Sequence, residues 1–342
     1  MSETSQTSDT GAQETHTGTV LRAVSGFFDV RPDAPLPPSP GETPSPGETP
    51  SPGERAGAGE PLIVRCRLRD RLRKDLVLTE SHSRARRVRE VRRLDVVEPV
   101  VAGDRVRFRL APTSGTAVLE GAIEEVLPRH RELTRQAVTD GSIPVGQTIV
   151  ANLDQVILVF AAAEPYPAAG LIDRFLVSCE YATLPALLVI NKADLGVAEI
   201  LAYDLAAYER AGYPVLLTSA ATGEGVDTLR QMVHGKTSAF VGPSGVGKST
   251  LLNTLEPGLA LRVGEVSAAT GKGRHTTRFA QLIPLHGGGY IADTPGLRQL
   301  ALWQVPDDVL DQQFPELRPY LGRCRFGNCA HVEDDGCAVK EA

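Results

Sequence analysis

Residues 238–250 have the sequence SAFVGPSGVGKST, in which a short apolar run leads into a glycine-rich loop. The loop matches the pattern G-x-x-x-x-G-K-[ST] at Gly242, Gly247, Lys248 and Ser249, and the helix-like segment TLLNTLE continues from it. A strand, a glycine-rich loop and a helix in this order form the context in which the pattern binds phosphate. The stretch therefore predicts a nucleotide-binding P-loop within an α/β domain.

The residue types of this loop suit the phosphates of a nucleotide. Glycines allow backbone N–H groups to turn toward phosphate oxygens, and the helix that follows adds its positive N-terminal end. We expect Lys248 to reach the β and γ phosphates and Ser249 to ligate Mg²⁺. The expected nucleotide contacts of the loop are Gly242, Pro243, Ser244, Gly245, Val246, Gly247, Lys248, Ser249 and Thr250.

A second motif, NKAD at residues 191–194, lies upstream and ends the stretch ALLVINKAD. Asp194 can accept hydrogen bonds from N1 and N2 of guanine, Asn191 can bond the ring and the neighbouring loops, and the stem of Lys192 can cover the base. Adenine has no matching pair of donors, and an unpaired buried carboxylate is costly, so the motif favours GTP over ATP. A third motif, TSA, would approach guanine O6 through backbone N–H groups of Thr218, Ser219 and Ala220.

A fourth motif, DTPG, follows the apolar run YIA and begins at Asp293. A carboxylate at this position holds Mg²⁺, usually through water, and the backbone N–H of Gly296 would meet the γ-phosphate. We therefore expect a magnesium ion held by Ser249 and Asp293.

From Gln155 onward, apolar runs alternate with helical segments, which is typical of a parallel sheet covered on both faces. Such sheets bind ligands at the carboxyl ends of their strands, where all four motifs would lie. Ordinary GTPases of the translation-factor branch carry the P-loop first, whereas here NKAD and TSA precede it. A circular permutation that opens the chain between the third and fourth strands explains the order, because each motif keeps its own strand end.

The N-terminal part has a different pattern. Residues 18–30 alternate like one strand, and the short strands of VAGDRVRFRLAP and GTAVLEGAIEEVLPR follow, which indicates a small β-barrel. A proline-rich insert, residues 32–61, is expected to be a linker without a function of its own. Five arginines on alternate positions would project from one face of a strand: Arg65, Arg67, Arg69, Arg71 and Arg73.

This arginine-rich region has a strong local charge. Residues 65–93 contain twelve basic and four acidic residues, a local balance of +8. The face suits contact with a nucleic-acid backbone, or else it is a solvated face without a partner.

Four potential metal ligands crowd the C-terminal segment. Their spacing is C-x4-C-x-H-x5-C, at Cys324, Cys329, His331 and Cys337. A complete Cys₃His set leaves no open coordination position, so it predicts a structural, tetrahedral zinc site. Because so short a segment cannot bury a core, the metal would supply its folding energy. Cys66 and Cys179 are expected to be ordinary buried thiols.

Composition limits the remaining possibilities. The chain has 342 residues, 42% of them hydrophobic, and a formal net charge of -6. This length suffices for two or three domains with real cores, and the charge argues against an overall basic nucleic-acid binder. No apolar stretch approaches the length of a membrane span, and the polar start lacks the features of a signal peptide. We therefore expect a cytoplasmic monomer without a membrane partner.

The order of the motifs, together with ANLDQVILV, GKGRHTTR and DTPGLRQL, resembles the circularly permuted GTPases of the ribosome small-subunit-dependent GTPase A family (YjeQ type). The resemblance covers most of the chain from Gly18 onward, apart from the proline-rich insert. It implies a multidomain α/β protein with an OB-type barrel (18–145), a permuted P-loop GTPase core with a mostly parallel sheet (146–302) and a zinc-binding domain (303–342). The polar residues 1–17 are expected to be a disordered tail. The resemblance also implies GTP or GDP, Mg²⁺, one structural Zn²⁺, and the small ribosomal subunit with its rRNA as the partner. In the family further helix follows the CAVK element, whereas this sequence ends at Ala342, which implies a shortened terminus.

The expected hydrolytic residues are Lys248, His275 and Gly296. Leu297 stands directly after DTPG, where a glutamine in many GTPases orients the attacking water, so we expect slow hydrolysis that needs another residue or a partner. The resemblance suggests that His275 positions this water; the alternative is a histidine that only packs or contacts phosphate. Either Thr276 or Thr277 would ligate Mg²⁺ when GTP is bound.

Two functions of different classes fit these features. One is a GTPase whose hydrolysis times late maturation of the 30S subunit and its own release. The other is an rRNA-binding scaffold in which the nucleotide is mainly structural, a possibility that Leu297 supports. An enzyme driven by ATP is disfavoured by NKAD.

Overall fold

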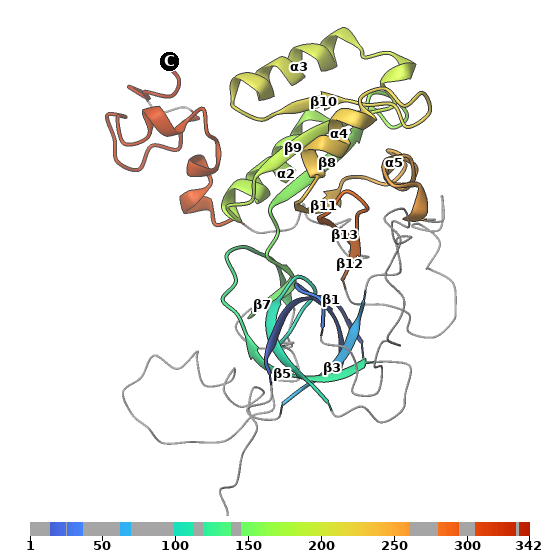
Figure 1. Cartoon of the computed structure of the whole chain (residues 1–342). Helices are drawn as coiled ribbons and strands as arrows, with labels where there is room; N and C mark the ends of the chain where they lie inside the picture. The colour runs from blue at the N-terminus through green and yellow to red at the C-terminus, as the bar shows by residue number, and fades with distance from the viewer. Residues whose placement is uncertain are drawn as a thin grey trace, which may run out of the picture. The chain divides into compact units, whose positions relative to one another are not determined.

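The computed structural model describes residues 14–24, 26–36, 62–69, 99–111, 119–137, 145–259, 280–293, 305–332 and 335–342. The chain divides into two compact units, Met1–Arg129 and His130–Ala342. The first unit holds a β-barrel, and the second holds the sheet that carries the sequence motifs (Figure 1). Among the described helices, none is both long and apolar enough to cross a bilayer.

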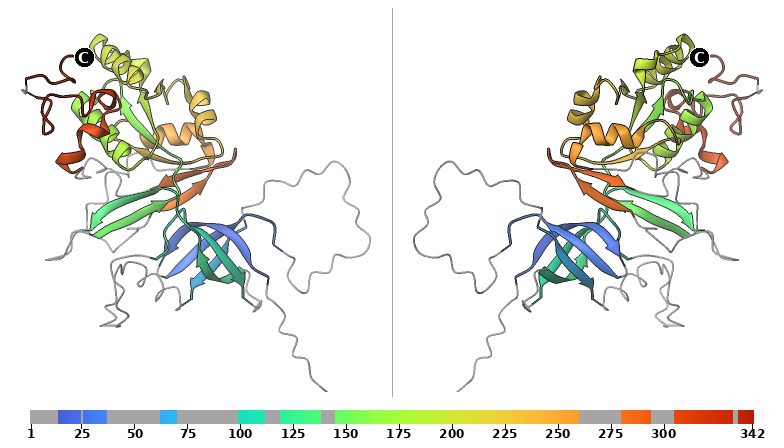
Figure 2. Two further views of the ribbon diagram at one scale, coloured as in Figure 1. Left: turned by 90° about the vertical axis from the view of Figure 1, so that its left-hand side faces the viewer. Right: turned by 90° about the vertical axis from the view of Figure 1, so that its right-hand side faces the viewer.

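The first unit is a closed five-stranded barrel, which Figure 2 shows from two further sides. Neighbouring strands follow the order β1-β2-β3-β5-β4, and β4 also pairs with β1, which closes the barrel. All pairs are antiparallel except β3 with β5. The expected OB-type barrel is therefore confirmed. Its strands are β1 (His16–Val24), β2 (Phe27–Pro32), β3 (Val64–Leu68), β4 (Arg105–Leu110) and β5 (Leu119–Val126).

The expectation of a single strand over residues 18–30 is wrong. These residues belong to two antiparallel strands, and Val24 pairs with Phe27 where the chain turns back. Gly26 lies in this turn with a φ of 81°, a conformation that glycine adopts without steric cost. Apolar alternation continues on both sides of the turn, so periodicity alone did not reveal the break.

Alternate residues of the barrel strands point inward and form one core. In β3, Val64 and Cys66 are buried, whereas Arg65 and Arg67 are exposed, as the alternation predicted. Arg71 and Arg73 lie outside the described residues. The buried core consists of Val20, Ala23, Phe28, Val30, Val64, Cys66, Val100, Val106, Phe108 and Ile123.

The second unit is built on a six-stranded sheet with the order β12-β13-β11-β8-β9-β10. The five strands from β13 to β10 run parallel, and β12 pairs antiparallel with β13 as a hairpin. The expected mostly parallel sheet is thus confirmed, with the P-loop strand β11 between β13 and β8. The strands are β8 (Gln155–Ala161), β9 (Ala186–Asn191), β10 (Val215–Leu217), β11 (Thr237–Val241), β12 (Gln281–Pro284) and β13 (Tyr290–Asp293).

Helices cover both faces of this sheet. Ile157 and Val159 of β8 pack in a cluster with α4 and α5, whereas the ring of Phe160 meets Phe175 of α2 edge-on, with centroids 5.8 Å apart. On the α2 side, the hydroxyl of Tyr208 on α3 donates to Asp173 of α2 at 2.6 Å. The helical elements are α2 (Ala169–Tyr181), α3 (Glu199–Arg210), α4 (Val226–Val233) and α5 (Lys248–Leu255), with the 3₁₀ turns η1 (Ala193–Leu195) and η2 (Pro257–Leu259).

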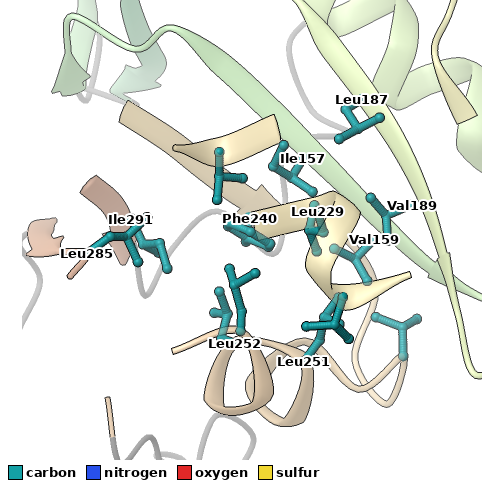
Figure 3. Close-up of a cluster of buried hydrophobic side chains, with 14 of the residues drawn as sticks. Ile157, Val159, Leu187, Val189, Leu229, Phe240, Leu251, Leu252, Leu285 and Ile291 are labelled. Carbon is teal, nitrogen blue, oxygen red and sulfur yellow. The ribbon is translucent and has the colours of Figure 1, made fainter. Parts of the chain in front are cut away.

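Figure 3 shows the apolar cluster beneath α4 and α5. Leu229 of α4 and Leu251 of α5 are fully buried against Ile157 and Phe240 of the sheet. Burying one such side chain stabilises the fold by roughly 1.5–3 kcal/mol. Because α5 begins at Lys248, this cluster also fixes the direction of the helix that leaves the P-loop.

Two smaller parts complete the second unit. A separate hairpin of β6 (Glu132–Ala137) and β7 (Val145–Ala151) precedes the sheet, and the expected domain boundary at 145/146 falls inside β7. The described C-terminal residues contain only the 3₁₀ turns η5 (Asp307–Val309), η6 (Asp311–Gln313) and η7 (Arg318–Tyr320). This C-terminal segment contacts α2, where Arg318 pairs with Glu180.

Candidate functional site

The sequence motifs meet at one edge of the sheet because their strands are parallel. Thr218 follows the end of β10, and Gly242 follows the end of β11. Asn191 is the last residue of β9, and Asp293 is the last residue of β13. The carboxyl ends of parallel strands lie at the same edge, where α/β sheets bind their ligands. The fold therefore brings together motifs that are far apart in the sequence, such as Asn191 and Asp293.

The P-loop conformation requires glycine at two positions. Gly242 has a φ of 149°, and a Cβ there would lie 2.0 Å from the carbonyl oxygen of Val159 on the neighbouring strand. Gly247 has a φ of 88°, and a Cβ there would lie 2.5 Å from Nδ2 of Asn191. Side chains other than hydrogen would push the loop away from β8 and from the NKAD motif.

Lys248 starts helix α5 and turns back over the loop. Its Nζ donates to the carbonyl oxygen of Gly242 at 2.7 Å and also contacts that of Pro243. The ammonium thus lies above the loop, where a phosphate-binding lysine is needed. Pro243, Ser244, Gly245 and Val246 complete the loop, and Ser249 and Thr250 follow in the first turn of α5.

Asn191 connects three loops of the site. It is 1% exposed, and its Nδ2 donates to the carbonyl oxygen of Val246 in the P-loop at 2.9 Å. Its Oδ1 accepts from the backbone N–H of Ala220 at 3.1 Å and from the hydroxyl of Thr218 at 3.3 Å. The amide therefore holds the base-side motifs and the P-loop in one arrangement.

Asp194 is exposed and lies beside Ser219 of the TSA motif. The buried hydroxyl of Ser219 donates to one of its carboxylate oxygens at 2.5 Å. Lys192 has a φ of 60°, and its Nζ contacts the carbonyl oxygen of Glu164. The Lys192 stem thus lies beside the P-loop, with its Cε 4.0 Å from the position of a Cβ on Gly247, and the Asp194 carboxylate is held by the TSA motif.

Sequence reasoning missed the loop that follows β8. Besides the contact of Glu164 with Lys192, the ring of Pro165 lies 3.6 Å from the position of a Cβ on Gly245. The loop therefore borders both the P-loop and the NKAD motif. Its position directly after a buried parallel strand was a usable signal, because such strand ends carry ligand loops.

The magnesium and catalytic residues are only partly described. Asp293 ends β13, and its Oδ2 accepts from Nε2 of Gln281 on β12 at 3.1 Å. Five predicted or discussed positions lie outside the described residues: His275, Thr276, Thr277, Gly296 and Leu297.

The four C-terminal ligands converge on one point. Nδ1 of His331 lies 3.5 Å from Sγ of Cys324, 3.6 Å from Sγ of Cys329 and 3.4 Å from Sγ of Cys337. All four candidate ligand atoms lie within 4.8 Å of one another. A tetrahedral zinc ion, bonded at about 2.3 Å to sulfur and about 2.0 Å to nitrogen, sets such nitrogen–sulfur distances at about 3.5 Å. The donors and their spacing therefore fit zinc.

The cysteines fall into two chemical groups. Burial alone would raise the pKa of Cys337, but hydrogen bonds from His331 and from the backbone of Lys340 outweigh it and lower the pKa to about 6. Its thiolate, the form that ligates metal, therefore prevails at neutral pH. Burial raises the pKa of Cys66 and of Cys179 to about 12, which keeps these two thiols protonated and inert, as expected.

Comparisons with known proteins agree with this geometry. The model of the family described as RsgA GTPase matches residues 126–303. A curated relative from Gemmatimonas aurantiaca, named small ribosomal subunit biogenesis GTPase RsgA, is 51% identical over 221 residues, which are 65% of this chain and 71% of the relative.

Two solved structures are similar over nearly the whole chain. The crystal structure of YjeQ from Thermotoga maritima matches with a TM-score of 0.65 and 30% identity, covering 96% of this chain and 91% of that one. The structure titled YloQ, a circularly permuted GTPase, matches with a TM-score of 0.61 and 25% identity, covering 98% and 90%. The predicted resemblance and the permuted order of motifs are thereby confirmed.

Proposed function

Because the chain belongs to the RsgA GTPase family and is thus a GTP-hydrolysing enzyme, we propose that it acts in the biogenesis of the small ribosomal subunit. It binds the immature 30S subunit, and GTP hydrolysis times late maturation and the release of the protein. The observation that carries the proposal is the convergence of the P-loop, NKAD, TSA and Asp293 at one sheet edge. The name of the Gemmatimonas aurantiaca relative, small ribosomal subunit biogenesis GTPase RsgA, supports the ribosomal role.

In this proposal each described loop binds a different part of the nucleotide. Asp194 accepts hydrogen bonds from guanine, and Asn191 keeps the base-side loops against the P-loop. Backbone N–H groups of the P-loop hold the phosphates, and Nζ of Lys248 exchanges its carbonyl partners for phosphate oxygens. A magnesium ion, when bound, neutralises charge that develops on the phosphates, and Ser249 and Asp293 are the described residues that would hold it.

Hydrolysis depends on a partner in this proposal. Leu297 cannot orient a water molecule by hydrogen bonding, so the unassisted rate is low. His275 is the candidate for positioning the water once the ribosomal subunit is bound. In this proposal, the inability of Leu297 to orient water keeps GTP bound until the ribosomal subunit triggers hydrolysis.

The barrel supplies the contact with rRNA. Arg65 and Arg69 are about half exposed although they pair with Asp29 and Glu124. Arg67 is exposed, and its guanidinium lies 4.8 Å from the centroid of the Phe27 ring. Exposed arginines on one strand face suit phosphate contacts that position the protein without reading sequence.

The test is GTP hydrolysis by the full chain with and without small ribosomal subunits. We expect strong stimulation by small subunits alone, little by large subunits, and no comparable turnover of ATP. Lys248→Ala serves as the inactive control, since it removes the phosphate-binding ammonium. Tight binding of small subunits without any stimulation would instead favour the rRNA-binding scaffold and refute the timing role.

A further inference from the structure

The two ring nitrogens of His331 face different surroundings. Nδ1 lies 3.4–3.6 Å from the three cysteine sulfurs, whereas Nε2 lies 3.4 Å from Oδ2 of Asp311. A histidine that ligates a metal through one nitrogen carries its proton on the other, and an acceptor at that N–H fixes both the tautomer and the ring orientation. Asp311 is the carboxylate that occupies this position.

The ring of His331 is held rather than free. Its side chain is 13% exposed, and that of Asp311 is 37% exposed, so the pair is partly shielded from water. His331 also has a φ of 62°, in the left-handed region, where histidine is more frequent than most other residues with a side chain. The contacts that hold the ring are therefore those of its two nitrogens, with the three sulfurs and with Asp311.

Asp311 belongs to a turn that is tied to helix α2 through Arg318. It begins η6, and the carbonyl oxygen of the next residue, Gln312, accepts from Nε of Arg318 at 2.9 Å. The same guanidinium pairs with Glu180 of α2. The carboxylate therefore comes from a part of the C-terminal segment that is fixed independently of the loop carrying the cysteines.

We propose that Asp311 is the positioning residue of the C-terminal metal centre. It accepts the Nε2–H of His331 and so directs the Nδ1 lone pair toward the point between the three sulfurs. The inference rests on the proposed zinc centre and adds a residue that lies outside the C-x4-C-x-H-x5-C motif. It also links the metal to α2 through Arg318.

The test measures Zn²⁺ affinity of the full chain after the metal has been removed, by competition with a chromophoric chelator. Asp311→Ala should bind Zn²⁺ roughly 10–100-fold more weakly, the usual loss for such partners. Asp311→Asn should recover most of the affinity, because its amide oxygen still accepts from Nε2–H. Asp308→Ala, which removes an exposed carboxylate from the neighbouring η5, is the matched control and should bind like the parent chain.

The visible spectrum of Co²⁺-loaded protein gives a second readout, because it reports the ligands and their tetrahedral arrangement. We expect a changed spectrum in Asp311→Ala and a parental spectrum in Asp311→Asn. Affinity of Asp311→Ala within twofold of the parent would overturn the role of Asp311, and so would equal losses in the Ala and Asn variants. A parent chain that binds no Zn²⁺ would overturn the metal centre itself, which separates the two failures.

Discussion

At the scale of single residues, Asn191 does most to assemble the nucleotide site. A buried amide is costly unless its donors and acceptors are satisfied, and here they bond Val246, Thr218 and Ala220. Because these partners belong to two other loops, the position of the P-loop relative to the base-side motifs depends on this one side chain.

Asp194 should determine the choice of base. Asp194→Ala removes the acceptor for the two guanine donors, and hydrogen bonds to a charged group contribute about 1.5–3 kcal/mol each, so we expect GTP affinity to fall ~100-fold or more. Titration with a fluorescent guanine nucleotide measures the change. Glu199→Ala, which removes an exposed carboxylate at the start of α3, is the control. Equal affinities of the two variants would contradict the assignment.

Asp104 should be essential for the stability of the barrel. Its buried carboxylate accepts from the backbone N–H of Val101 at 2.8 Å and pairs with Arg129 through contacts of 2.7 and 2.9 Å. Asp104→Ala leaves the guanidinium without its buried partner, at a cost of about 3–5 kcal/mol. Hydrogen exchange of barrel amides measures this loss. Glu120→Ala on β5 removes an exposed carboxylate and should have little effect.

At the scale of elements, the packing of α4 and α5 on the sheet holds the helix that leaves the P-loop in place. Leu229→Ala removes a fully buried side chain from the cluster in Figure 3 and should destabilise the second unit by about 2–5 kcal/mol. Urea unfolding monitored by helix circular dichroism tests this expectation. The control is Gln231→Ala, an exposed position on the same helix, and a similar loss in the control would speak against core packing as the cause.

The C-terminal segment should depend on its metal. With zinc bound, Cys324, Cys329 and Cys337 should resist alkylation, and removal of the metal by a chelator should expose all three while Cys66 and Cys179 stay unmodified. Mass spectrometry of alkylated peptides measures the pattern. Protons compete with zinc for the Cys337 thiolate, whose pKa without metal is lowered to about 6. Zinc affinity should therefore fall as the pH decreases below 6, and an affinity that stays constant between pH 7 and pH 5 would argue against thiolate ligands.

At the scale of the whole molecule, basic and acidic residues are unevenly distributed along the chain. The chain has a net charge of -6, yet residues 65–93 carry a local +8. A local basic region on an acidic protein favours binding to nucleic acid at one place rather than all over the surface.

Arg67→Glu should therefore weaken binding to small subunits. The slope of log K against log salt concentration should become shallower by about 1, the value expected for the loss of one phosphate contact. It should leave hydrolysis without subunits unchanged, because Arg67 belongs to the barrel. Arg210→Glu makes the same change of charge at the end of α3 in the second unit. Subunit sedimentation at several salt concentrations compares them, and equal weakening by both variants would show a general effect of charge.

The sequence predicted the architecture because its signals are local. Short apolar runs marked buried parallel strands, and motifs such as NKAD and GPSGVGKS marked the ends of those strands. It missed the turn at Gly26, since alternation continued through it, and it missed the loop at Glu164, which has no motif. The turn becomes visible only through the pairing of Val24 with Phe27, whereas the role of the Glu164 loop depends on its contact with Lys192, which is distant in the sequence.

By itself, the sequence determined which residue types stand at strand ends and which four ligands share the C-terminal segment. Only the tertiary structure decided that Asn191 bonds the P-loop, that Lys192 contacts Glu164 and that Asp311 faces His331. The physical reason is the distance along the sequence over which each kind of signal acts. Periodicity and motifs act over a few residues, whereas these contacts join segments that become neighbours only when the parallel sheet places its strand ends side by side and the C-terminal segment packs on α2.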